Sequence, residues 1–461
     1  MRARVLAATT AALALAACNL DPAYVRPAPP VPASFPQGPA YAPNQPGPAA
    51  SEVRWREFFT DPNLRSVIEL ALDNNRDLRV AAANIEAARA QYRIERSNLF
   101  PSVGANGSAT VARPGGGAPT EHLYSVSLGF SAWELDLFGR IRSLSRAALE
   151  QFLATEEARR ATQTSLIAEV ASDYEQLAAD RQLLTVAQQT LAAQQASLDL
   201  TRARFAAGVA SALDVDQAQT TVETARADVA QFTTQAAQDQ NALNLVAGTT
   251  APDALLPAGL AATPGMMVDL PAGVSSTVLL MRPDILQAEH QLRANNADIG
   301  AARAAFFPTI TLTAGAGAAS TALSGLFDTA ARTWSFVPTI SLPIFNAGRT
   351  RANLHLAQAQ RDAAVAQYER AIQAAFQEVA DALARRGTIA DQIGADQRLV
   401  AAATEAVQLT NARYQRGTDP YLNVLVAQRT LYSAQQALVS IRLVQLTNAV
   451  SLYRALGGGV G

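Results

Sequence analysis

Side chains that commonly carry nucleophilic or metal chemistry are scarce here, with one cysteine and three histidines among 461 residues. The histidines, His122, His290 and His355, are dispersed, and neither an HExxH nor a GxSxG motif occurs. All 37 basic residues are arginines, which excludes a P-loop lysine, a pyridoxal Schiff base and a Ser-Lys nucleophile. We therefore expect no enzyme activity, no catalytic residues, no metal site and no bound cofactor.

Cys18 ends a short N-terminal segment that has the features of a secretion signal. Two arginines, an apolar stretch and small residues precede the thiol. This order resembles a bacterial lipobox, which implies removal of residues 1–17 and covalent lipid on Cys18. The apolar stretch is too short to span a hydrocarbon core of about 30 Å, so a permanent membrane helix is disfavoured.

Internal repetition dominates the remaining sequence. Phe100-Pro101 recurs 207 positions later as Phe307-Pro308, and Gly139-Arg140 recurs 209 positions later as Gly348-Arg349. The change of two residues between these landmarks belongs in a loop. We expect a Pro-rich tether at 18–50, a first repeat at 51–250, an equatorial linker at 251–281 and a second repeat at 282–461.

Each repeat is expected to contain a leading helix, two strands and a long helical hairpin. The expected leading helices are 64–98 and 283–305; the strands are about 100–112, 122–134, 307–318 and 333–345; the hairpin helices are about 140–207, 212–247, 349–416 and 421–456.

The expected strands have the length and alternation of membrane strands. Tyr124, Val126, Leu128 and Phe130 alternate with Ser or Gly, and aromatic residues lie toward strand ends. A soluble sandwich is the alternative. Four strands cannot close a membrane barrel, two chains would give a filled eight-stranded barrel, and three would give twelve strands with a lumen.

The long helices predict supercoiled rods. The stretch 141–207 lacks Pro and Gly and could reach about 100 Å at 1.5 Å per residue. Apolar residues recur every seven positions, which indicates packed neighbouring helices; they are Val170, Leu177, Leu184, Leu191, Leu198 and Phe205. An ordinary antiparallel coiled coil would show the same seam, but two hairpins, each joined to a strand pair, favour the wall of a water-filled tube.

Several motifs in order carry a family resemblance over essentially the whole mature chain. They are Asp21-Pro22-Ala23-Tyr24-Val25-Arg26-Pro27, Trp55-Arg56-Glu57-Phe58-Phe59, Arg282-Pro283-Asp284-Ile285 and Asn346-Ala347-Gly348-Arg349. The chain resembles the outer-membrane channel lipoproteins of tripartite RND-type efflux systems, in the TolC-like superfamily and the OprM/NodT type.

The resemblance implies a mainly α fold with β structure, in a homotrimer. Its twelve-stranded outer-membrane β-barrel would continue as a coiled-coil α-barrel in the periplasm. The implied function is passive conduction of small organic compounds or drugs to the exterior. A periplasmic adaptor and an inner-membrane transporter would deliver them.

The turns between the hairpin helices are the expected periplasmic tips. The resemblance implies an acidic residue in the second turn that helps to constrict the closed mouth, and Asp419 matches it; our hypothesis is that Asp419, Tyr414 and Arg416 form the gate. The resemblance also implies adaptor docking at Gly208 and Gly417, and Ser211 in the first turn is a further candidate. Three copies of Asp419 near a threefold axis would repel, raising their apparent pKa, with Arg413 and Arg416 as candidate partners. The alternative is that Asp419 only caps the next helix.

Other functions remain in competition. One alternative is a TolC-like channel with a different cargo, either secreted proteins or metal ions. The four Met and three His of the chain offer no metal-binding cluster along a lumen. A periplasmic coiled-coil adaptor lipoprotein would need one hairpin rather than two. The formal charge of -2 without a basic run argues against nucleic acid as a partner.

Overall fold

The computed structural model describes residues 20–41, 53–117, 119–261, 264–267 and 275–458, so Cys18 lies outside the described part. The chain divides into two compact units. The sheet unit comprises Met1–Ala28, Ala82–Glu157 and Leu286–Arg370, and the hairpin unit comprises Pro29–Ala81, Ala158–Ile285 and Ala371–Gly461.

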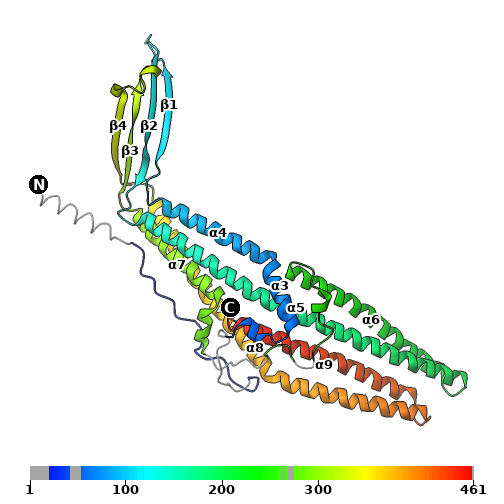
Figure 1. The fold of residues 1–461 in the computed structure, drawn as a ribbon. Coiled ribbons are helices and arrows are strands. Elements are labelled where there is room, and N and C mark those ends of the chain that lie inside the picture. Colours follow the sequence, from blue (N-terminus) through cyan, green and yellow to red (C-terminus); the bar gives the residue numbers. More distant parts are fainter. Residues whose placement is uncertain (1–19, 42–52, 118, 262–263, 268–274, 459–461) are drawn as a thin grey trace. The chain divides into compact units, whose positions relative to one another are not determined.

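Long helices and a four-stranded sheet make up the fold (Figure 1). The α-helices are α2 (Trp55–Phe58), α3 (Pro62–Asn74), α4 (Arg76–Ser97), α5 (Arg140–Ala206), α6 (Ala212–Ala247), α7 (Pro283–Ala304), α8 (Arg349–Gln415) and α9 (Tyr421–Ala455). The strands are β1 (Gly104–Ala112), β2 (Glu121–Glu134), β3 (Thr309–Ser320) and β4 (Arg332–Ser341). Short 3-10 turns lie at Asp253–Leu255, Ser276–Met281, Leu323–Gly325 and Thr329–Ala331.

The expected leading helix at 64–98 is two helices that meet at Asn75. The Asn75 amide oxygen accepts a hydrogen bond from the Leu78 backbone N–H at 3.0 Å, and its Nδ2 donates to the Val246 carbonyl at 2.8 Å. Asn75 has an extended ψ of 135°, which interrupts the helix. The prediction of one continuous helix was wrong because the side chain of Asn75 replaces helical hydrogen bonds at that position.

Antiparallel pairing gives the sheet the order β1-β2-β3-β4 and two different faces. One cross-strand row consists of Asn106, Ser127, Gly317 and Thr333, and the neighbouring row on the opposite face consists of Ala105, Leu128, Ala316 and Trp334. Successive side chains of a strand point to opposite faces. The sheet therefore has a polar, glycine-rich face and an apolar face.

The fourth strand ends earlier than the expected residue 345. Ser341 pairs with Thr309, the first residue of β3, so the residues after Ser341 have no partner on β3. Pro308 and Pro343 lack backbone N–H groups at this end of the pair. Strand β4 therefore ends where neither strand of the pair has a proline-free continuation that could donate further backbone hydrogen bonds.

The hairpin unit buries the apolar seam of its helices unevenly. Val170, Leu177 and Leu198 are buried, whereas Phe205 is 49% exposed. A cluster near the turns joins both hairpins and contains Leu198, Ala218, Val222, Tyr414, Tyr421, Val424 and Leu425. None of the described helices is long and apolar enough to cross a membrane.

Candidate functional site

The turns after α5 and α8 share one backbone design. Gly208 and Gly417 both have φ of 75°, a left-handed conformation that glycine adopts without steric cost. Their N–H groups donate to Phe205 and Tyr414 carbonyls at 2.9 Å in each case. Each turn thus satisfies the free carbonyls at the end of a very long helix.

The first turn continues into a capping box. Ser211 Oγ accepts from the Asp214 backbone N–H at 3.1 Å, and Asp214 Oδ2 accepts from the Ser211 N–H at 2.9 Å. These two bonds satisfy donors at the start of α6. The structure therefore gives Ser211 a local role in starting the helix.

The second turn carries an ion pair instead. Arg413 Nε and Nη2 donate to the two carboxylate oxygens of Asp419 at 2.7 and 2.9 Å. Within one chain, hydrogen bonding from Arg413 lowers the pKa of Asp419. The prediction of Arg413 as a partner is confirmed, and the capping alternative is wrong because Pro420 occupies the N-cap of α9.

Tyr414 lies inside the protein rather than at the rim of the turn. It is 4% exposed, and its ring centroid lies 5.4 Å from that of Tyr421. The guanidinium of Arg204, from the other hairpin, lies 4.6 Å from the Tyr414 ring centroid. Any role of Tyr414 in a gate is therefore exerted through packing between the hairpins.

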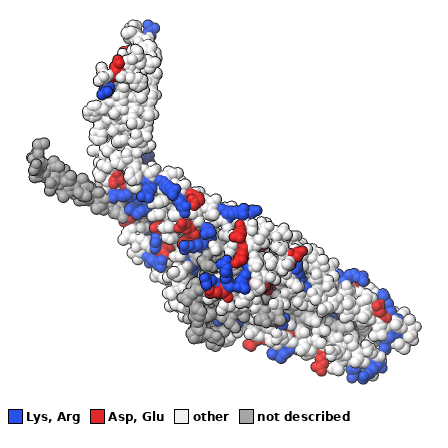
Figure 2. All heavy atoms as spheres, viewed as in Figure 1, with Lys and Arg blue, Asp and Glu red and all other residues white. Residues whose placement is uncertain are grey.

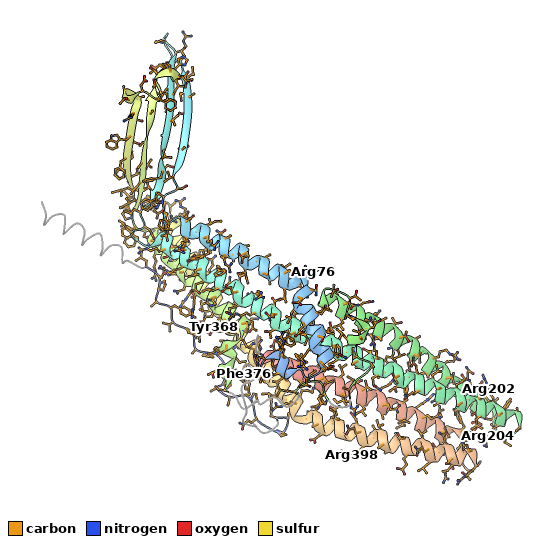
Figure 3. The ribbon with its side chains drawn as sticks, in the orientation of Figure 1. Arg76, Arg202, Arg204, Tyr368, Phe376 and Arg398 are labelled. Carbon is orange, nitrogen blue, oxygen red and sulfur yellow. The ribbon has the colours of Figure 1, made fainter. Side chains whose placement is uncertain are left out.

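Arg204 joins the end of α5 to the end of α8. Its Nη1 donates to the Tyr414 carbonyl at 3.1 Å and to the Gln415 carbonyl at 3.3 Å. Figure 3 shows Arg204 near the end of α5, beside Arg202. We call this set of contacts the clasp. Among the described residues no ion pair engages Arg416, so the structure does not bring this predicted gate residue to Asp419.

Sequence reasoning missed Arg204, although a signal was present. Adding the repeat offset of 209 to Arg204 gives Arg413, so both turns have an arginine at the same place. The two arginines have different partners because Asp419 corresponds to Ala210 in the first turn. A comparison of the two repeats residue by residue would have identified Arg204 as a candidate.

A groove lies beside the clasp, between α5 and helices α8 and α9. Its volume is about 260 Å³. The lining residues from both hairpins are mostly polar or small and include Gln194, Ser197, Asn411, Tyr414, Gln428 and Tyr432. This end of the hairpin unit thus has a hollow lined by residues of both hairpins.

The sheet unit provides a second candidate surface. A hollow of about 350 Å³ lies over the polar face and is lined by residues such as Asn106, Ser127, Thr313 and Ser335. On the apolar face, Trp334 and Ile340 are 81% and 69% exposed. Figure 2 shows almost no charged atoms along the sheet except near its far end. The surface suits contact with an apolar medium on one side and water on the other.

The described residues contain no group of three or more His, Cys, Asp or Glu side chains that could hold a metal ion.

Comparison with known proteins identifies relatives of the whole chain. The family model described as "Outer membrane efflux protein" matches residues 67–249 and again residues 274–458. The antibiotic efflux pump outer membrane protein ArpC and the toluene efflux pump outer membrane protein TtgC, both of Pseudomonas putida, are each 49% identical, with 100% of this chain and 96% of the relative covered. The crystal structure of the open state of the MtrE outer membrane channel of Neisseria gonorrhoeae superposes with a TM-score of 0.88 at 37% identity, covering 96% of this chain and 99% of that one.

Proposed function

Because the chain belongs to the outer membrane efflux protein family, we propose that it forms the outer-membrane exit duct of a tripartite efflux pump as a homotrimer. The protein is an outer-membrane component that conducts substrates rather than converting them. Three copies would share one twelve-stranded barrel, continued on the periplasmic side by an α-barrel built from the hairpins.

The two-faced sheet with open edges is the observation that carries this proposal. Strand β1 pairs only with β2, and β4 only with β3, so each outer strand has one side unpaired within the described chain. Unpaired backbone groups cost several kcal/mol each in a bilayer, so the edges need partners there. Three sheets provide twelve strands, which enclose a lumen, and the polar face would line it.

Small organic compounds are the cargo that the comparisons support. Relatives with about half of their residues identical to this chain are named for toluene and for antibiotics. Protein secretion and metal efflux remain the alternatives for cargo, and a periplasmic adaptor lipoprotein remains the alternative of a different class. In the proposed duct an inner-membrane RND-type transporter supplies the energy.

The helix turns are the proposed periplasmic mouth. Asp419 and Arg413 would lie at its rim, and the clasp of Arg204 on Tyr414 would hold the two hairpins of one chain together. Gly208, Ser211 and Gly417 lie at or beside the turns, where a periplasmic adaptor would bind. Arg416 belongs to the proposed rim through its position beside Gly417.

A detergent-corrected mass tests the proposal. The full-length protein, with its own signal, would be extracted from isolated outer membranes and measured by light scattering. We expect a mass of three chains, each carrying lipid on Cys18. A monomer recovered from the soluble periplasm would contradict the duct and support the adaptor alternative.

A further inference from the structure

Two buried oxygen atoms in the wall of the groove beside the clasp have no hydrogen-bond partner among the described residues. They are the hydroxyl of Tyr414 on α8 and Oε1 of Gln428 on α9, and both side chains line the groove. Tyr414 is 4% exposed, so water reaches its hydroxyl only through the groove or not at all. Because a buried polar atom without a partner is unfavourable, this wall has a donor and an acceptor that a bound molecule would satisfy.

Two neighbours hold the ring of Tyr414 in place. The guanidinium of Arg204 lies 4.6 Å from the ring centroid, and the centroid of the Tyr421 ring lies 5.4 Å away at an interplanar angle of 59°. Tyr421 is itself 1% exposed and belongs to the cluster that joins both hairpins. The Tyr414 hydroxyl therefore cannot turn to another part of the protein without breaking these contacts, and a partner for it has to come from the groove.

The wall of the groove is uncharged. None of the described residues that line it has a charged side chain. Apolar side chains contribute beside the amides and hydroxyls, namely Leu200, Val407 and Leu431. An ion would lose its hydration here without gaining a countercharge, so the groove suits an uncharged occupant.

The size of the groove and its two unpaired oxygens define the occupant further. A volume of about 260 Å³ lies just below the range of about 300–1,000 Å³ that is usual for drug-sized ligands. The apolar side chains and the ring of Tyr432 suit an aromatic body. A ligand hydroxyl would donate to Gln428 Oε1 and accept from the Tyr414 O–H, because a hydroxyl does both. A phenol of one or two rings combines these properties.

Both hairpins of one chain contribute to the groove. Helix α5 provides residues between Thr190 and Leu200, and α8 and α9 provide residues between Val407 and Gln435. A molecule in the groove therefore contacts both hairpins only while they are packed together. A ligand favours the arrangement that it binds more tightly, so occupation would strengthen the packing that the clasp also maintains.

We propose that the groove is a binding site for small uncharged phenols, with the ligand hydroxyl held between Tyr414 and Gln428, and that occupation keeps the tips closed. The site itself lies within one chain and goes beyond the proposed function. Its effect on the tips rests on the proposed duct. The ligand would thus act as an inhibitor of conduction rather than as a cargo in transit.

Photo-crosslinking with 4-hydroxybenzophenone tests the site. The purified full-length protein would be irradiated with this probe at a pH at which its hydroxyl is protonated, and the crosslinked peptides would be identified by mass spectrometry. We expect crosslinks on α5 near Leu200 and on α9 near Leu431. The same concentration of 4-methylbenzophenone, which has a similar size but lacks the hydroxyl, should label these peptides about tenfold less because hydrogen bonding is lost.

Tyr414→Phe removes only the unpaired hydroxyl, so no hydrogen bond within the described protein is lost and the fold should be retained. The variant should lower labelling by 4-hydroxybenzophenone about tenfold and leave labelling by 4-methylbenzophenone unchanged. Tyr368→Phe is the matched control. The Tyr368 hydroxyl is also buried without a partner among the described residues, but Tyr368 belongs to the sheet unit and does not line the groove. This control should keep wild-type labelling.

A second pair of variants tests the hollow rather than the hydroxyl. Ala193→Leu places a larger side chain in the groove and should lower labelling by both probes, whereas Ala192→Leu, at an exposed neighbour that does not line the groove, should not. Equal labelling by the two probes, or wild-type labelling in Tyr414→Phe or Ala193→Leu, would overturn the site. A wild type without crosslinks in the groove would also overturn it.

Single-channel recording without irradiation tests the effect on the tips. Added 4-hydroxybenzophenone should lower the open probability of the wild type, and this decrease should be about tenfold weaker in concentration dependence for Tyr414→Phe. Labelling of the groove with no change in open probability would overturn the effect on the tips. A mass that is not that of a trimer would refute the duct, yet labelling of the groove would still be measurable on the chain, so the two failures are distinguishable.

Discussion

Replacing Arg204 with alanine should open the proposed periplasmic mouth. The substitution removes hydrogen bonds to the Tyr414 and Gln415 carbonyls and the contact with the Tyr414 ring. A hydrogen bond from a charged donor contributes about 1.5–3 kcal/mol, and an exposed cation–π contact about 0.5–1 kcal/mol. Arg204 is half-buried and its two hydrogen bonds share one nitrogen, so we take the lost contacts to contribute about 2 kcal/mol per chain to the closed state. Their loss would shift the equilibrium between closed and open tips about 30-fold.

Single-channel recording measures this shift. The purified trimer would be placed in planar bilayers, and its open probability compared at fixed voltage and salt. Arg202→Ala is the matched control, because Arg202 binds Gln219 within its own hairpin at 2.7 Å and its loss removes the same charge from the same helix end. Arg204→Lys should have an open probability between those of the wild type and Arg204→Ala, because lysine retains the charge but not the planar guanidinium group.

Equal open probabilities for Arg204→Ala and Arg202→Ala, in trimers of equal thermal stability, would refute a role of the clasp in closing the tips. That result would mean that the clasp positions the tips without holding them closed. An increase in both variants would instead assign the effect to the lost positive charge.

Two further outcomes follow from the acidic residues. Asp419→Ala frees Arg413 and should raise the basal open probability, whereas Asp216→Ala, at an exposed position of α6, should not; unchanged conductance would remove Asp419 from the gate. Burial raises the pKa of Glu175 from 4.5 to about 7, and the charge of nearby Asp61 adds to this effect. Ionisation of Glu175 therefore does not change the stability of the folded state below pH 4.5, but it lowers that stability by about 3 kcal/mol above pH 7. Glu175→Gln should therefore raise the melting temperature of the trimer increasingly from pH 4.5 to 7, and a constant difference would contradict this origin; Glu223→Gln, at an exposed position, is the control.

Much of the fold could be predicted because the repeat and the periodicities are properties of the chain itself. Alternation in residues 124–130 located β2, and the absence of Pro and Gly located α5. The break at Asn75 could not be predicted in this way, since it depends on a hydrogen bond to Val246 from a distant helix. The early end of β4 likewise depends on where its partner strand begins.

The candidate site was predictable at the level of local contacts. Asp419 and Arg413 are six residues apart across one turn, and the sequence indicated their pairing. The clasp joins residues that are about 210 positions apart, so spacing along the chain gives no indication of it. Burial of Tyr414 also depends on Tyr421 and Arg204, which only the packed hairpins bring to it.

The two turns share their backbone but differ in their side chains, and this difference limits the symmetry of anything that binds them. In a trimer of such chains, six loops with the same backbone turn would form the rim, but only alternate ones would carry an arginine–carboxylate pair. A ring of six identical partner subunits would consequently meet two kinds of neighbour in alternation. Such a ring must bind both surfaces equally well or bind them with unequal strength. Duplication within one gene thus gives the rim six loop positions but only threefold chemical symmetry.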